Sequence, residues 1–87
     1  LSVPARVARA VLQLAQHLGE PSGTDDQVMV RHNLRQSDLA ALAGVARESV
    51  SRTISRWRDR DILSMPNRTT YRFSRAKLQA EARTHAD

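Results

Sequence analysis

The feature that most constrains the fold is a glycine between two short stretches with helical periodicity. Apolar residues recur three and four positions apart in 36–43, before Gly44, and four and seven positions apart in 47–57, after it. Apolar residues at this spacing lie on one face of a helix. Glycine adopts left-handed backbone angles without steric cost, so it can end the first helix and reverse the chain. The sequence therefore predicts two helices joined by a tight turn.

The apolar positions divide the first of these helices into a buried and an exposed side. We expect Leu39, Leu42 and Ala43 to face the core. The small side chain of Ala40 would allow a close helix crossing, and Val45 would fill the corner after the turn. The same spacing argument defines the sides of the second helix.

In the second helix, Val50, Ile54 and Trp57 form the expected buried seam. The side away from that seam carries charged and hydroxyl side chains: Arg47, Glu48, Ser51, Arg52 and Ser55. The charged run over 59–61 ends this helix. The two helices therefore extend over about 36–59, with a polar surface on the second.

An amphipathic helix is predicted near the N-terminus, over about 4–18. Its apolar stripe repeats at helical spacing and comprises Val7, Val11, Leu14, Ala15 and Leu18. Ser2 and Pro4 supply the start, Gly19 and Pro21 supply the stop, and His17 can cap a carbonyl near the end. Residues 19–26 are predicted to be a turn-rich linker, and the apolar run around 28–30 a short strand followed by an exposed His32.

The C-terminal part predicts a hairpin and a last helix. Apolar and β-branched runs over 62–73 flank a Pro66–Asn67 turn, a pattern typical of a β-hairpin. Ser74 can cap a short helix over about 75–82 that buries Leu78. The tail beyond it is expected to fray, and His85 within it has no inferable role.

Size and composition limit the classes of protein that fit. Eighty-seven residues suffice for one core, so we expect 1–87 to form a single domain. The chain has no cysteine, no membrane-length apolar run and no signal-peptide pattern, so a cytoplasmic protein without membrane contact is expected. Because it starts at Leu1 instead of methionine, we expect it to be part of a longer protein.

The basic charge is confined to the second part of the chain. Residues 1–34 hold three arginines and three acids, whereas 35–87 hold eleven basic groups and six acids. Thirteen of the fourteen cations are arginine, whose planar guanidinium suits phosphate oxygens and guanine edges. This distribution favours a polyanionic partner, although a solvated surface with scattered charge is the alternative.

The order of elements is that of a mainly α fold with a small β-hairpin, the winged helix-turn-helix, with residues 62–73 as the wing. On the exposed helix, arginine can donate two hydrogen bonds to guanine, and glutamate can accept from the cytosine amino group. We therefore expect Arg47, Glu48 and Arg52 to read bases. The alternative for Glu48 and Arg52 is an ordinary surface ion pair, since they lie four residues apart.

Other cations divide into two groups. Arg68 and Arg72 on the wing are expected to contact phosphates, whereas Arg56, Arg58 and Arg60 fit a phosphate contact or a solvated cation equally well.

The segment LRQSDLAALAGVARESVSRTISRWRDRDIL resembles the C-terminal DNA-binding domain of the cyclic-AMP receptor protein and FNR family of bacterial transcription regulators. Residues 6–15 resemble the leading helix of that domain, and the hairpin resembles its wing. The likeness implies base reading by Arg47, Glu48, Ser51 and Arg52. Phosphate contacts are expected at six positions: Arg35, Gln36, Ser49, Ser55, Arg68 and Arg72.

The family also implies parts that these residues do not include. Its regulators carry an N-terminal effector and dimerisation domain, so we expect no cofactor in this chain, a homodimer in the full-length protein, and contact with RNA polymerase. Arg35 and Ala46 depart from the family, which usually has serine or threonine as helix caps there. A missing cap hydroxyl costs about 1 kcal/mol, so both helix starts are expected to be less firmly tied.

Three functions fit a chain of this kind to different degrees. The first is sequence-specific binding of double-stranded DNA in transcription regulation. The second is a winged helix that buries the polar side of 47–55 against another protein. The third, an enzyme, is disfavoured because the histidines lie on separate elements and the sequence has no glycine-rich phosphate loop.

Overall fold

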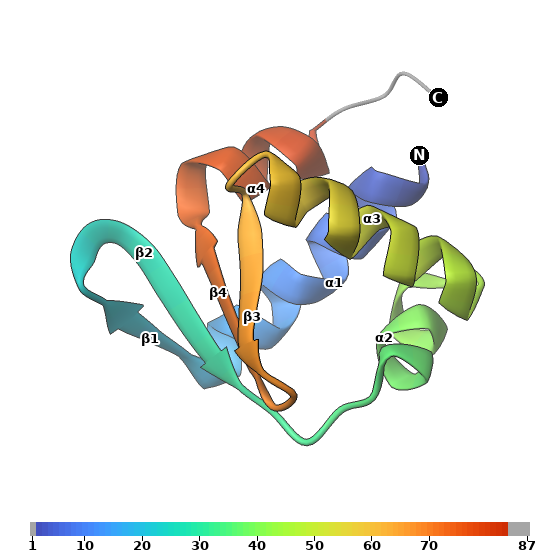
Figure 1. Cartoon of the computed structure of the whole chain (residues 1–87), viewed down its shortest axis with the longest axis horizontal. Helices are drawn as coiled ribbons and strands as arrows, with labels where there is room; N and C mark the ends of the chain where they lie inside the picture. The colour runs from blue at the N-terminus through green and yellow to red at the C-terminus, as the bar shows by residue number, and fades with distance from the viewer. Residues whose placement is uncertain (1, 84–87) are drawn as a thin grey trace.

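The computed structural model describes residues 2–83 and contains, within them, four helices and four strands (Figure 1). The elements follow one another as α1 (Val3–Leu18), β1 (Gly19–Ser22), β2 (Thr24–Arg31), α2 (Gln36–Ala43), α3 (Arg47–Asp59), β3 (Leu63–Asn67), β4 (Thr70–Ser74) and α4 (Arg75–Ala82). This is the predicted winged helix-turn-helix, with β1 as an additional strand. Residues 84–87, which include most of the predicted frayed tail and His85, lie outside the described part. No described helix is long and apolar enough to cross a membrane.

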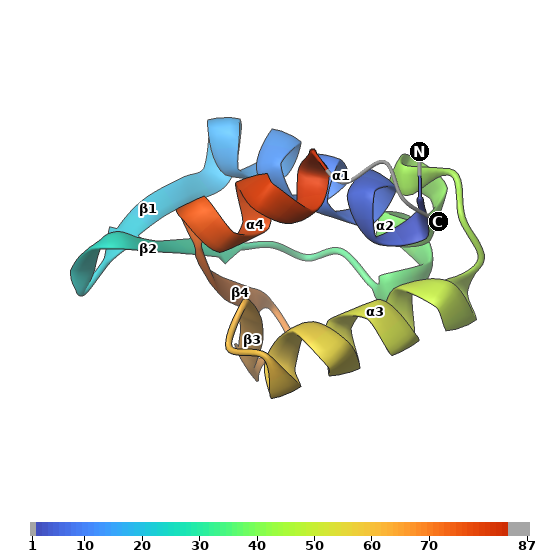
Figure 2. The same cartoon turned by 90° about the horizontal axis from the view of Figure 1, so that it is seen from above.

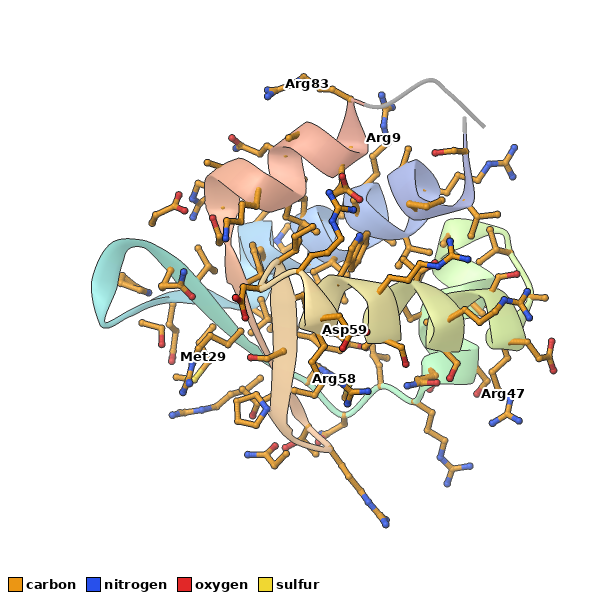
Figure 3. All side chains as sticks on the ribbon, turned by 45° about the horizontal axis from the view of Figure 1, so that its top comes forward. Arg9, Met29, Arg47, Arg58, Asp59 and Arg83 are labelled. Atoms are coloured by element: carbon orange, nitrogen blue, oxygen red, sulfur yellow. The ribbon has the colours of Figure 1, made fainter. Side chains whose placement is uncertain are left out.

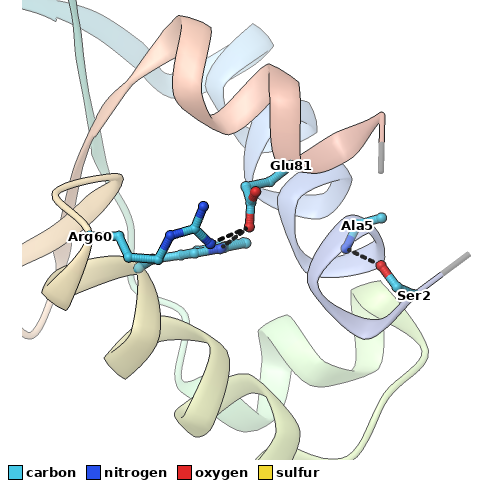
Figure 4. Close-up of polar contacts among 5 residues, drawn as sticks. Ser2, Ala5, Arg60 and Glu81 are labelled. Atoms are coloured by element: carbon cyan, nitrogen blue, oxygen red, sulfur yellow. Dashed lines mark hydrogen bonds and ion pairs between the residues drawn. The ribbon is translucent and has the colours of Figure 1, made fainter. Parts of the chain in front are cut away.

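Helix α1 begins at the predicted cap. The Ala5 N–H donates a hydrogen bond to Ser2 Oγ (3.3 Å; Figure 4). Val7 and Val11 are fully buried, as the periodicity predicts, whereas Leu18 is 45% exposed and the prediction of its burial is wrong. Leu18 ends the helix where the chain turns into the edge strand β1, so little of the core extends over it.

The four strands form one antiparallel sheet in the order β1-β2-β4-β3. Val28 pairs with Phe73, and Val30 pairs with Tyr71, and all four side chains are buried. Successive side chains of a strand point to opposite faces, so Arg72, between the two aromatic residues, lies on the other face and is exposed. The hydrophobic core therefore covers one face of the sheet.

The prediction of a linker over residues 19–26 is wrong. Strand β1 pairs with β2, and Gly23, with a φ of +79°, makes the reversal between them. Proline lacks an N–H and is tolerated on an edge strand, so Pro21 did not exclude pairing, although it looked like a loop signal. The resulting hairpin projects away from the α2–α3 pair (Figures 1 and 2).

Gly44 makes the predicted turn between α2 and α3. Its backbone is left-handed (φ +71°, ψ +37°), and the Val45 N–H donates to the Ala40 carbonyl at 3.0 Å. Leu39 is buried, as expected, and Ala40 is also buried, in agreement with the close helix crossing that its small side chain allows.

The predicted inward position of Leu42 is wrong. Its side chain is 56% exposed and lines a concavity of about 480 Å³ between α1 and α2. A helix of two turns contributes only a narrow stripe to the core, and Leu39 and Ala40 fill it. Leu42 lies at the edge of that stripe, opposite the polar Gln13 and Gln16 of α1.

Helix α4 closes the core and fixes the end of α3. The Lys77 N–H donates to Ser74 Oγ, the predicted cap, and Leu78 is fully buried. The Trp57 indole N–H donates to Glu81 Oε1 (3.0 Å), and Arg60 forms an ion pair with the same oxygen (3.3 Å; Figure 4). In Figure 2, α1 and α4 lie on one side of the molecule, and α3 lies on the other side with β3 and β4.

Candidate nucleic-acid interface

The side chains predicted to read bases lie together on the exposed side of α3. Arg47, Glu48, Ser51 and Arg52 are all exposed, and with Gln36 of α2 they line one concavity of about 240 Å³. Figure 3 shows Arg47 extending outward from the first turn of α3. The turn at Gly44 therefore brings the start of α2 beside the start of α3, and both contribute to one polar surface.

A buried seam holds α3 in this orientation. Val50, Ile54 and Trp57 are buried as predicted, and Thr53, which is not among the predicted seam positions, is only 3% exposed. Its hydroxyl donates to the Ser49 carbonyl at 2.8 Å, which satisfies the polar group inside the core. Helical periodicity alone could have identified Thr53, which lies three residues after Val50 and four before Trp57.

The surface ion pair between Glu48 and Arg52 is not formed. The two ion pairs seen in the described part of the chain join Arg31 to Glu20 and Arg60 to Glu81. Glu48 and Arg52 are both exposed, so the carboxylate and the guanidinium can each meet an external partner.

The two helix starts differ in how they are tied. Neither Arg35 nor Ala46 offers a capping side chain. At α2, Asp38 Oδ2 accepts a hydrogen bond from the Arg35 N–H (2.9 Å), which ties this helix start although no side chain caps the N–H groups of its first turn. At α3, Glu48 places a negative charge in the first turn, where the helix dipole favours it.

The residues predicted to contact phosphates surround this polar surface without forming one cluster. Arg35 and Gln36 lie at the start of α2, Ser49 and Ser55 on α3, and Arg68 and Arg72 on the wing. Ser49 is half-buried and shares a concavity of about 210 Å³ with Arg52, Arg56 and Pro4. Ser55 is exposed and accepts a hydrogen bond from Arg58 Nη2 at 3.5 Å. The basic and hydroxyl groups therefore extend along both flanks of α3.

The wing turn lies two residues further along than predicted. Strand β3 includes Pro66 and Asn67, and the turn is made by Arg68 and Thr69. Asn67 Oδ1 accepts hydrogen bonds from the Thr69 N–H and hydroxyl, both at 3.0 Å. Arg68 is exposed at this turn. The side chain of an asparagine bonding two residues ahead is a common way to close a turn, so the wing tip is well defined.

The three cations whose roles were left open have different surroundings. Arg60 is paired with Glu81, so its charge is already engaged. Arg56 lies towards the start of α1. Arg58 shares a concavity with the exposed Arg72 of the wing, and Figure 3 shows it on the flank of α3 beside the strands.

His32 connects the wing to the chain that enters α2, and the prediction that it is exposed is wrong. It is 5% exposed, and its ring stacks on Tyr71 with centroids 4.2 Å apart. The backbone N–H of His32 donates to the Thr69 carbonyl (2.7 Å), and the ring Nδ1 of His32 accepts from the Leu34 N–H (3.1 Å). Burial lowers the pKa of His32 and raises that of Tyr71. No periodic signal marks this residue in the sequence, because it follows the last strand position.

Metal-ligating residues do not assemble in the described part of the chain. No group of three histidine, cysteine, aspartate or glutamate side chains among the described residues could hold a metal ion.

Known proteins match this chain in sequence and in fold. The Crp-like helix-turn-helix domain matches residues 5–81. A CRP-like cAMP-activated global transcriptional regulator of Mycobacterium tuberculosis (strain ATCC 25618 / H37Rv) is 32% identical over 81 residues, which are 93% of this chain and 35% of that protein. The chain therefore spans about a third of the length of this relative.

Three solved structures show the same fold at low sequence identity. Oxidized CprK with o-chlorophenolacetic acid has a TM-score of 0.80 and 19% identity, and the match covers 98% of this chain and 35% of that one. A CRP/FNR-family regulator from Thermus thermophilus has a TM-score of 0.78, 20% identity and coverage of 98% and 42%. FixK2 from Bradyrhizobium japonicum has a TM-score of 0.77, 21% identity and coverage of 98% and 40%.

The matched range of residues 5–81 includes both helices around Gly44, the whole sheet and the wing. The winged helix-turn-helix architecture, the polar outer side of α3 and this match lead to the same assignment. The chain belongs to the family of Crp-like helix-turn-helix domains.

Proposed function

We propose that this chain binds double-stranded DNA with sequence specificity and acts in transcription regulation, with α3 in the major groove and the wing on the DNA backbone. The observation that carries the proposal is the shared concavity of Arg47, Glu48, Ser51 and Arg52 on the side of α3 opposite its buried seam. An α-helix fits the major groove, and residues near its N-terminus are those that reach base edges.

Each side chain has a role that follows from its hydrogen-bonding groups. Arg47 and Arg52 donate to guanine O6 and N7, Glu48 accepts from the cytosine amino group, and the Ser51 hydroxyl contacts either kind of edge. The Glu48 carboxylate has no cation within 4 Å among the described residues, so base contact does not require an internal ion pair to break.

Phosphate contacts would position α3 without reading sequence. Arg35 and Gln36 at the start of α2, Ser49 and Ser55 on α3, and Arg68 and Arg72 on the wing are the proposed ligands. Arg68 is the best placed of the wing residues because the Asn67–Thr69 hydrogen bonds fix the turn that carries it.

The partners of the longer protein are part of the same proposal. We propose that the full-length protein is a homodimer that binds two half-sites one helical turn apart, as symmetric helix-turn-helix proteins do. Contact with RNA polymerase would follow from a role in transcription activation. Membership of a family whose named relative is a transcriptional regulator supports both.

The test is selection of binding sites from a random duplex library, followed by affinity measurements on the selected site at two salt concentrations. A recurring sequence and an affinity that falls steeply with salt are expected, because phosphate contacts release counterions. A chain that selects no sequence, or whose binding does not depend on salt, would contradict the proposal and favour a protein-interaction role for the same surface. A scrambled duplex of equal length is the control.

A further inference from the structure

Beside the proposed reading surface, α3 and the wing enclose a second, smaller hollow that the base contacts do not use. It has a volume of about 210 Å³ and lies between the last turns of α3 and the strands of the wing. Its polar and charged lining consists of Gln27, Arg58, Asp61, Ser64 and Arg72. We refer to it as the wing notch.

The two arginines of the wing notch come from different elements that the fold holds in place. Arg72 lies on β4 directly opposite Ser64 of β3, on the sheet face away from the core. Arg58 lies eleven residues after Arg47 in α3 and seven after Ser51, so at 100° per residue all three lie on one flank of the helix. The flank of α3 that carries Arg47 and Ser51 therefore leads to Arg58 and the wing notch.

The charges of the wing notch are not neutralised from within. Among the side chains that the structure describes, neither Arg58 nor Arg72 has a carboxylate within 4 Å, in contrast to Arg60 and Arg31, which form ion pairs. Arg58 Nη2 donates to the Ser55 hydroxyl, which is neutral. Asp61 also lines the notch and opposes an anion, but the Lys77 ammonium group donates to the Asp61 carbonyl and adds a third cation nearby.

The position of the notch suggests which anion it takes. A helix in the major groove and a wing on the neighbouring backbone lie on the two sides of one sugar-phosphate strand, and the notch is the space between those two elements. We propose that the wing notch binds one phosphate of this strand through Arg58 and Arg72, and that it thereby sets the distance between α3 and the wing on the DNA. This inference rests on the proposed function.

The variants to test are Arg58→Gln, Arg72→Gln and the double variant of the whole chain, on the duplex that the wild type selects. Because both arginines hold the same phosphate, the double change should lower the slope of log affinity against log salt by about 0.9, and each single change by no more than that. A fourfold change in salt would then alter the affinity of the double variant about 3.5-fold less than that of the wild type. Arg83→Gln, an exposed arginine beyond α4 (Figure 3), is the matched control and should leave the slope unchanged.

A second measurement locates the contact. One backbone phosphate at a time is replaced by a neutral methylphosphonate, and affinity is compared for wild type and double variant. At one phosphate per half-site the wild type should lose affinity, whereas the double variant should lose nothing further. Arg58→Lys with Arg72→Lys should keep most of the salt slope, since the charge remains.

The outcomes separate this inference from the proposed function. If the wild type binds with salt dependence and the glutamine variants show the same salt slope, phosphate binding in the wing notch is contradicted, and the proposed base reading is unaffected. Phosphate binding in the wing notch is also contradicted if, at every methylphosphonate position, the double variant loses as much affinity as the wild type does. A wild type that selects no DNA would contradict the proposed function itself.

Discussion

The two ends of α3 are built differently. At its C-terminal end, Trp57 is buried and hydrogen-bonded to Glu81, and Arg60 is paired with the same carboxylate of α4. At its N-terminal end, Arg47, Glu48 and Arg52 are exposed and have no ion pairs among the described residues. The C-terminal end is anchored to the core, and the N-terminal end presents charged groups that form no ion pair with another described residue. The packing contacts of α3 therefore lie at one end of the helix, and the proposed base-reading residues lie at the other.

The largest expected effect comes from removing the anchor. Trp57→Ala should lower the free energy of unfolding by about 3 to 5 kcal/mol, because it opens a large cavity and leaves Glu81 without its indole donor. Urea denaturation followed by circular dichroism measures it. Ser51→Ala, at the open end, is the control and should stay within about 0.5 kcal/mol of wild type. Equal effects of the two substitutions would abolish the distinction between the ends.

Next in size is the loss of a base contact at the open end. Arg52→Ala should remove about 1 to 3 kcal/mol of discrimination at one base pair and leave the free energy of unfolding nearly unchanged. Titrations against the selected duplex and its single-base variants measure it, with Arg83→Ala as the control. If affinity fell by the same factor on every duplex, Arg52 would be a phosphate ligand and not a base-reading residue.

The junction between wing and α2 should respond to pH. Burial lowers the pKa of His32 below 6.5, so the unfolded chain takes up a proton more readily than the folded one. Stability should therefore be unaffected by this residue above about pH 6.5 and should fall as pH decreases from there through the folded pKa. Protonation also removes the Nδ1 lone pair that accepts from the Leu34 N–H. Urea midpoints across this pH range measure the effect, and a slope that persists in His32→Asn would assign it to other groups.

The smallest expected effect concerns the charge of the anchor. Glu81→Gln keeps an oxygen acceptor for the Trp57 indole and loses only the ion pair to Arg60, a side chain that is 61% exposed. The loss should be below about 1 kcal/mol and should shrink with added salt. Glu20→Gln is the matched control, because its ion pair with Arg31 is long and exposed. A loss as large as that of Trp57→Ala would show that the charge, not packing, holds the helix.

Periodicity predicted the parts of the fold that bury one face against a core. The seam of Val50, Ile54 and Trp57, the turn at Gly44 and the alternation of Tyr71 and Phe73 are all as expected, because each follows from spacing or from a residue with special backbone freedom. The exposure of the four proposed base-reading residues follows from the same seam. Their contacts with DNA stay predictions.

Features that depend on tertiary pairing were not predictable in this way. Strand β1 is recognisable only through its partner β2, since its own residues show no alternation. His32 is buried because Tyr71 and the wing turn enclose it, although they lie far along the chain. Leu42 is exposed because no described element covers the edge of a two-turn helix.

The turn of the β1–β2 hairpin has a practical consequence. Gly23 lies at the tip of a hairpin that points away from α3, and no described atom beyond Gly23 and its two chain neighbours lies within 4 Å of the place where its Cβ would be (Figure 1). Exposed tips of this kind tolerate insertions well. A short peptide tag inserted beside Gly23, which itself is kept because its φ of +79° would strain any other residue, would report on the chain at a distance from its polar surface.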